Sequence, residues 1–178
     1  MRWLVDGYNV IRRDPDLRSR EAESLEAGRA ALLGLVAGLA RDSRDEFTVV
    51  FDGARRGGAA PPAGRVQVLF SRPPETADDV LARLARQHGQ GAVLVTSDRA
   101  VRDRGHRAGC AVLHAEEFLA GAAARAASSG SEVLASEGRE DDDDDRAERT
   151  GGVKRGNPRR LSKEARAARR ALRRLRDR

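Results

Sequence analysis

The chain has 178 residues, a formal net charge of +6 at pH 7, a sequence pI near 10.7 and one cysteine. This length supports one domain with a sizeable core. A single cysteine excludes a disulfide framework and a cysteine-based zinc site, and no apolar run approaches the length of a membrane helix. We therefore expect a soluble, cytoplasmic protein with no membrane contact, whose basic charge favours a polyanionic partner such as nucleic acid.

The chain opens with a short apolar run that stops on a carboxylate. Trp3, Leu4 and Val5 predict a buried strand, and Gly7 predicts the turn that follows it. Asp6 lies between them, at the carboxyl end of the strand. Ligands bind at that edge of open α/β sheets, so Asp6 is either a ligand-binding carboxylate or a side chain that caps the next turn.

Strand and helix patterns then alternate along the chain. Residues 12–20 are polar and rich in turn formers, and Ser24 is a plausible N-cap for the helix after it. Strands are predicted at 3–5, 47–51, 65–70, 93–95 and 110–113, and helices at 25–39, 76–84, 98–106 and 116–127. This alternation predicts a mostly parallel sheet with helices on both faces, a Rossmann-like α/β three-layer sandwich over residues 1–127.

The C-terminal part differs in composition. Residues 128–157 combine low hydrophobicity with an acidic run at 140–145 and predict a disordered acidic linker. Residues 158–178 predict a basic amphipathic helix with an apolar seam at Leu161, Ala165, Ala168, Leu172 and Leu175. The acidic run is either a solvated linker or a segment that folds back on the basic helix and competes with RNA.

Five aspartates share one predicted position at the carboxyl edge of the sheet. Asp6, Asp52 and Asp98 follow strands, and Asp78 and Asp79 lie in the first turn of the helix that begins at Thr76. Carboxylates that converge repel one another unless a cation neutralises them. An all-oxygen set favours Mg²⁺ or Mn²⁺, so we expect a metal site here.

Each of these aspartates also has a structural interpretation. Thr76 and Asp79 have the spacing of a capping box, Asp98 suits an N-cap, and Asp52 suits a turn with Gly53. The sequence leaves these alternatives open. No glycine-rich phosphate loop, nucleophile elbow or zinc-binding helix motif is present, so we expect no small-molecule organic cofactor.

Four stretches together resemble a known family. They are Val5 to Ile11, Val50 to Gly53, Glu75 to Asp79 and Val95 to Asp98. In that order and spacing they resemble the NYN domain of the bacterial YacP-like group, which belongs with the PIN-like nucleases. The resemblance covers residues 1 to about 127. It implies a metal-dependent endoribonuclease, and one branch of the family is associated with the ribosome and cleaves mRNA.

The resemblance also implies site residues. It places the metal-site acids at Asp6, Asp78 and Asp98, adds Asp52 and Asp79 as further candidates, and makes Asn9 a polar catalytic residue. We expect hydrolysis of RNA phosphodiester bonds with Mg²⁺ or Mn²⁺. Arginines near the same edge are expected to bind the RNA backbone, namely Arg12, Arg13, Arg55, Arg56, Arg99 and Arg102.

Two other functions remain open on the sequence. The chain could be an RNA- or ribosome-binding module without catalysis, or a phosphohydrolase of small molecules. The role of Tyr8 is also open, because its ring could stack on a base or pack beneath the sheet.

Overall fold

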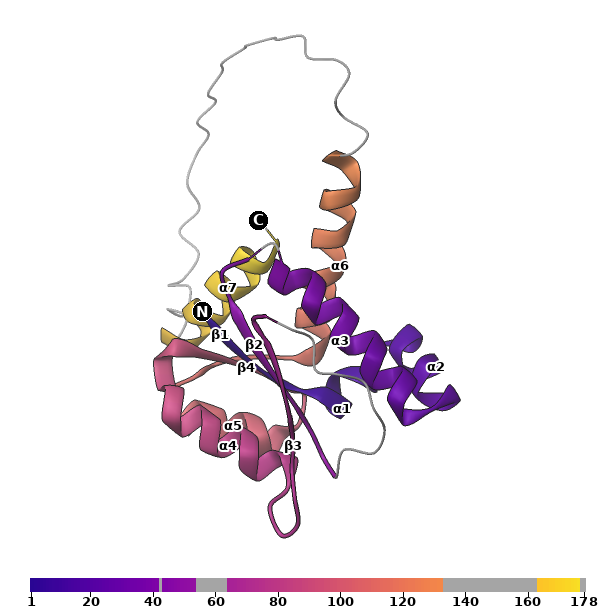
Figure 1. Ribbon diagram of the computed structural model, residues 1–178. Coiled ribbons are helices and arrows are strands. Elements are labelled where there is room, and N and C mark those ends of the chain that lie inside the picture. The colour runs from indigo at the N-terminus through magenta and orange to yellow at the C-terminus, as the bar shows by residue number, and fades with distance from the viewer. Residues whose placement is uncertain (42, 54–63, 133–162, 177–178) are drawn as a thin grey trace, which may run out of the picture.

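The computed structural model describes residues 1–41, 43–53, 64–132 and 163–176, which include a five-stranded parallel sheet (Figure 1). The strand order is β3-β2-β1-β4-β5, and every neighbouring pair is parallel. The strands are β1 (Arg2–Asp6), β2 (Glu46–Phe51), β3 (Val66–Phe70), β4 (Ala92–Val95) and β5 (Ala111–Leu113). All five predicted strands are confirmed to within one residue, and the predicted α/β class is confirmed.

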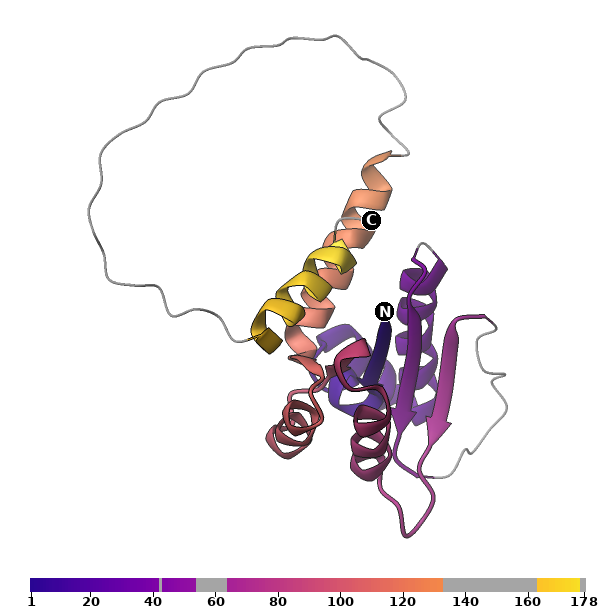
Figure 2. The same cartoon turned by 90° about the vertical axis from the view of Figure 1, so that its left-hand side faces the viewer.

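Helices cover both faces of the sheet and make three layers (Figures 1 and 2). One face carries α4 (Ala77–His88) and α5 (Arg99–Arg107), and the short 3-10 turn η1 (Gly89–Gly91) follows α4. The other face carries α1 (Gly7–Ile11), α3 (Leu25–Arg41), α6 (Ala115–Glu132) and α7 (Lys163–Arg176), with α2 (Pro15–Glu23) packed beside α3. No helix in the described segments is long and apolar enough to cross a membrane.

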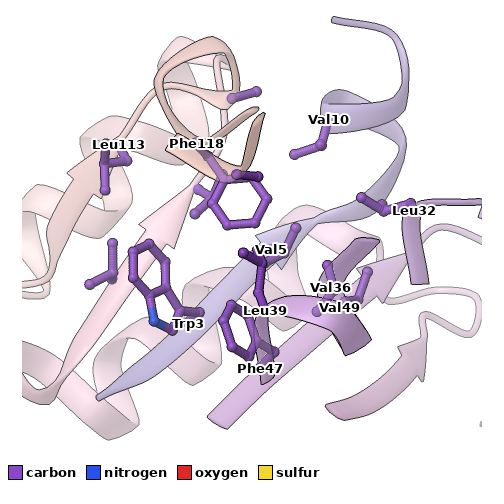
Figure 3. Packing of buried hydrophobic residues seen from close by; sticks show 14 of the residues in the cluster. Trp3, Val5, Val10, Leu32, Val36, Leu39, Phe47, Val49, Leu113 and Phe118 are labelled. Carbon is purple, nitrogen blue, oxygen red and sulfur yellow. The ribbon is translucent and has the colours of Figure 1, made fainter. Parts of the chain in front are cut away.

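The larger core lies between the sheet and the helices α1, α3, α6 and α7. Trp3 of β1 stacks on Phe47 of β2 with ring centroids 5.8 Å apart, and Phe118 of α6 meets Trp3 at 5.9 Å (Figure 3). These three side chains are at most 1% exposed. With few aromatic residues in the chain, they concentrate the large buried surface at the centre of the sheet.

The polar, turn-rich residues 12–20 form a turn at 12–14 and then begin the helix α2, which the sequence pattern does not predict. Asp14 accepts hydrogen bonds from the backbone N–H groups of Asp16 (3.0 Å) and Leu17 (2.9 Å), and Pro15 occupies the first helical turn of α2. An N-cap followed by proline is a strong helix start. The sequence does not indicate this helix because the helix buries only Leu17 and therefore has no apolar period.

Gly7 has a different role from the predicted turn. It is the first residue of α1, and a Cβ at this position would lie 2.3 Å from the Phe51 ring. Glycine therefore lets α1 start directly above β2. Asp6, the last residue of β1, is also the N-cap of α1.

The C-terminal helix α7 lies alongside α6 (Figure 2) and also contacts β5. Ala171 and Leu175 are buried in the larger core, and a Cβ on Gly121 of α6 would lie 2.9 Å from the Leu175 side chain. Arg174 contacts the buried Asp45 at 3.4 Å. Of the expected linker, residues 128–132 continue α6, and the remainder, with Leu161 of the seam, lies outside the described residues.

Candidate active site at the carboxyl edge of the sheet

A cleft of about 810 Å³ opens at the carboxyl edge of the sheet. It lies over the ends of β1, β2 and β4 and the start of α4, where parallel α/β folds bind ligands. Its lining includes the carboxylates Asp6, Glu26, Asp52, Asp78 and Asp98, the amide of Asn9, and the cations Arg12 and Arg29. Four of the five predicted metal-site aspartates are thus brought together.

Asp6 is the buried carboxylate of the cleft, with 9% of its surface exposed. Its Oδ2 accepts a 2.8 Å hydrogen bond from Thr96 Oγ1, and its Oδ1 accepts one of 3.3 Å from the Asn9 N–H. Burial raises the pKa of Asp6 to about 6, and the negative charges of Asp78 and Asp98 add to the rise, against the two hydrogen bonds. Asp6 therefore changes charge close to neutral pH.

Asp78 is half-buried and faces the same cleft from the first turn of α4. Burial raises its pKa, and the nearby negative charge of Asp98 raises it further. Within the described segments its carboxylate has no hydrogen-bonded partner, so a cation in the cleft would relieve this repulsion directly.

Asp98 and Asp52 combine a structural role with a place in the cleft. Asp98 Oδ1 caps α5 through the N–H groups of Ala100 (2.8 Å) and Val101 (3.1 Å). Asp52 Oδ1 accepts from Ser71 Oγ and from the Ala77 N–H at 3.3 Å. In each residue these bonds go to Oδ1, and Oδ2 accepts no hydrogen bond from the described part of the chain.

Asp79 lies outside the cleft. Its Oδ2 accepts from the Thr76 N–H at 3.2 Å, and its own N–H donates to Thr76 Oγ1 at 3.3 Å, which is a complete capping box. Its Oδ1 pairs with Arg104 at 3.3 Å. The hydrogen bonds from Thr76 hold its pKa below the usual value. Asp79 is therefore a helix-capping residue of α4, which is the structural alternative given for it from the sequence.

Asn9 is fixed by the loop after β4. Its Oδ1 accepts a 2.7 Å hydrogen bond from the Ser97 N–H, which joins α1 to that loop. Thr96 and Ser97 therefore position Asp6 and Asn9, although neither was predicted as a site residue. The sequence signal for them is their place directly before Asp98, within the stretch Val95 to Asp98 that carries part of the family resemblance.

The predicted RNA-binding arginines lie in different places. Arg12 lines the cleft, with its guanidinium 5.7 Å from the Tyr8 ring centroid. Arg13 pairs with Glu116 at 3.2 Å, and Arg102 contacts His114 Nε2 at 2.6 Å. Neither of these two, nor the exposed Arg99, lines the cleft, whereas Arg55 and Arg56 lie outside the described residues.

Arg29 of α3 is a cleft cation that the sequence did not indicate. Its Nε donates to the Tyr8 hydroxyl at 2.8 Å. Its guanidinium lies 5.4 Å from the Tyr8 ring centroid, 5.6 Å from that of Phe51 and 5.2 Å from that of Phe70. Such stacking holds a planar cation in place. The Tyr8 ring packs on Phe51, and Tyr8 also lines the cleft.

The carboxylates form no ready cage for a metal ion. Among the residues that the structure describes, no three His, Cys, Asp or Glu side chains are grouped closely enough to hold one. The donor set is nevertheless all oxygen, and Mg²⁺ commonly takes one or two carboxylates and keeps several waters. The cleft therefore fits a hydrated divalent ion, held partly through water.

Comparison with known proteins gives consistent results. A family model described as the YacP-like NYN domain matches residues 3–171. The chain is 35% identical over 85 residues to the uncharacterized protein YacP of Bacillus subtilis (strain 168), a match of 47% of this chain and 50% of that protein. The match thus spans about half the length of this curated relative.

Solved structures extend the similarity to most of the chain. A crystal structure of Rae1 (YacP) from Bacillus subtilis has 28% identity and a TM-score of 0.65, over 75% of this chain and 80% of that one. A second, of a point mutant of the same protein, has 27% identity and a TM-score of 0.64, over 79% and 86%.

Proposed function

Because the chain belongs to the YacP-like NYN domain family, whose domains are nuclease-like, we propose that it is a metal-dependent endoribonuclease that hydrolyses phosphodiester bonds in RNA. The observation that supports this most is the grouping of Asp6, Asp78 and Asp98 in one cleft with Arg12 and Arg29. Carboxylates that repel one another beside fixed cations suit a site for a divalent ion and a phosphate.

The residues divide this work between them. Asp6, Asp78 and Asp98 would hold Mg²⁺ or Mn²⁺, with Asp52 as a further acid in the lining. When bound, the metal lowers the pKa of water and neutralises charge on the phosphate. Asn9, held by the Ser97 N–H, orients the attacking water or the substrate.

Arg12 and Arg29 bind the phosphate of the substrate. Tyr8 supports both, since both guanidinium groups lie within 6 Å of its ring centroid, at 5.7 and 5.4 Å. Contacts of this kind recognise the backbone without reading bases. We therefore expect little sequence preference from the cleft itself.

The family resemblance further suggests mRNA on the ribosome as the natural substrate and setting. The basic α7 supports a polyanionic partner, because Arg166, Arg169 and Arg170 are exposed on it. Sedimentation with ribosomes tests this part. If the chain stays at the top of the gradient at low salt, the ribosome is not a partner. The proposal that the chain hydrolyses RNA does not depend on this result.

The proposal is tested with purified protein and a long single-stranded RNA labelled at one end. We expect shortened labelled products from cuts at internal bonds, with new 5′-phosphates at the cut sites, in Mg²⁺ or Mn²⁺, and intact RNA in EDTA. RNA that remains intact with either metal contradicts the proposal.

A second candidate function is RNA binding without catalysis. It is favoured by the finding that the described residues contain no preassembled group of three metal-binding side chains. A pure binder keeps its affinity for RNA in EDTA and never shortens the RNA, so the same assay separates the two functions.

A further inference from the structure

A second, smaller depression of about 440 Å³ lies between α4 and α5. These helices run side by side on the same face of the sheet (Figures 1 and 2). Four arginines line it, two from each helix, together with two acids and a floor of small residues: Arg83, Arg86, Arg104, Arg107, Glu75, Asp79, Ala82 and Ala108. We call this depression the α4–α5 groove.

Helix geometry and small side chains create this groove. Residues three apart lie on the same face of a helix, so Arg83 and Arg86 project from one side and Arg104 and Arg107 from the other. Between the two pairs, the small side chain of Ala82 leaves space for the depression. Gly105 brings α5 close to the sheet, because a Cβ there would lie 2.5 Å from the Leu94 side chain.

The charge in the groove is uneven along its length. At the end nearer the cleft, Glu75 pairs with Arg83 at 3.2 Å and Asp79 pairs with Arg104 at 3.3 Å. At the far end Arg86 and Arg107 are exposed, and neither has an ion pair with any residue that the structure describes. The helix dipole favours a cation in the last turn of a helix, which accounts for Arg86 in α4 and Arg107 in α5 separately. It does not account for the position of these two cations on opposite sides of one groove.

The groove adjoins the candidate active site. Asp78 lines the cleft, and the next residue, Asp79, lines the groove. From Asp79 to Arg86 the helix advances by ~10 Å. A strand of RNA that leaves the cleft over the start of α4 would therefore come close to Arg86 and Arg107.

We propose that the α4–α5 groove binds the phosphate backbone of the RNA strand next to the bond that is cleaved in the cleft. This inference rests on the proposed function for its ligand. The groove contains no aromatic side chain, so it offers no stacking platform for bases and recognises charge alone. It therefore increases the affinity for long RNA without adding sequence preference.

The test measures RNA binding rather than cleavage. In an Asp78→Asn background, which prevents loss of the RNA, the double variant Arg86→Gln/Arg107→Gln is compared with Arg18→Gln/Arg41→Gln. The control removes the same charge from exposed arginines outside the cleft and the groove. Fluorescence anisotropy with a long single-stranded RNA gives Kd over a series of salt concentrations.

We expect the groove variant to bind RNA about tenfold more weakly than the control at low salt. The slope of log K against log salt should fall by about 1.4, which corresponds to about 0.7 for each of two lost phosphate contacts. Equal affinity and equal slope in the two double variants overturn the proposal. Weaker binding of polyglutamate with unchanged RNA binding also overturns it, in favour of an acidic protein partner.

Failure of the proposed function gives a different result. If the Asp78→Asn variants show the predicted dependence of RNA binding on Arg86 and Arg107, but the unsubstituted chain never shortens RNA, the groove is supported and the nuclease is contradicted. If the unsubstituted chain cleaves RNA but the groove and control variants bind RNA equally well, the nuclease is supported and the groove is contradicted.

Discussion

Thr96 Oγ1 donates a 2.8 Å hydrogen bond to Asp6 Oδ2, and the two residues are 90 positions apart in the sequence. The bond joins the carboxyl ends of β1 and β4, which are neighbours in the sheet. The Thr96 hydroxyl is a neutral donor, so it stabilises the buried carboxylate without a compensating positive charge. Asp6 thus stays in the cleft as an acid whose pKa burial raises to about 6.

Replacing Asp6 by Asn should change how stability depends on pH. The pKa of Asp6 is about 6 in the folded chain and 3.8 in the absence of burial. The folded state therefore binds the proton more tightly, so this group stabilises the fold below about pH 4 and loses that contribution as pH rises through 6. Two pKa units correspond to about 3 kcal/mol.

Urea unfolding of the wild-type chain and Asp6→Asn at several pH values measures this effect. We expect the wild type to lose up to about 3 kcal/mol relative to the variant between pH 4 and pH 7.5. Titrating groups that do not interact with Asp6 cancel in the difference, whereas Asp78 and Asp98 interact with it and add to the difference. A difference that is the same at both pH values contradicts the raised pKa.

Thr96→Val should destabilise the chain, whereas Thr96→Ser should not. Valine has nearly the same shape but removes the donor to Asp6 and the acceptor for the Asp98 N–H at 3.1 Å. An unsatisfied buried group costs about 1–3 kcal/mol. The cost should be largest at pH 8, where Asp6 is ionised, and chemical denaturation of both variants measures it. Equal stability of the two variants contradicts a role for the hydroxyl.

Asp78→Asn and Asp79→Asn should have opposite effects although the residues are adjacent. Asp78 faces the cleft and Asp79 caps α4. We expect Asp78→Asn to lower kcat for RNA cleavage by at least about a hundredfold, the range of a lost catalytic group, with little change in Tm. Asp79→Asn should lower Tm and leave kcat within about fivefold. Similar kcat losses in both variants would contradict this division.

Leu175→Ala should destabilise the whole domain, because α7 belongs to its core. Leu175 is 4% exposed and packs against Gly121 of α6. Truncating a buried leucine costs about 2–5 kcal/mol. The exposed Arg170→Ala is the control. If α7 were only a tethered RNA-binding tail, both variants would unfold at the wild-type temperature.

The sequence predicted the strands well and the site only in part. The buried strands have apolar runs followed by carboxylates, so the sequence alone places Asp6, Asp52 and Asp98 at one edge of the sheet. Local patterns also indicated that Asp79 could cap α4, but only the structure shows that its side chain bonds to Thr76 and Arg104 and does not line the cleft.

The missed residues depend on contacts between distant parts of the chain. Arg29 lies on α3, and it becomes part of the site because Tyr8, Phe51 and Phe70 surround its guanidinium. Thr96 supports Asp6 through the pairing of β1 with β4. No pattern within a short window of sequence records either contact.

The most direct test of the account is the initial rate of RNA cleavage by Asp6→Asn in Mg²⁺, compared with the wild-type chain. The unfolding experiment above shows whether the variant is folded, so a loss of rate reports on the carboxylate. We predict a rate at least about a hundredfold lower than that of the wild type. A clean preparation of the folded variant that cleaves RNA at the full wild-type rate would contradict the assignment of this cleft as the active site.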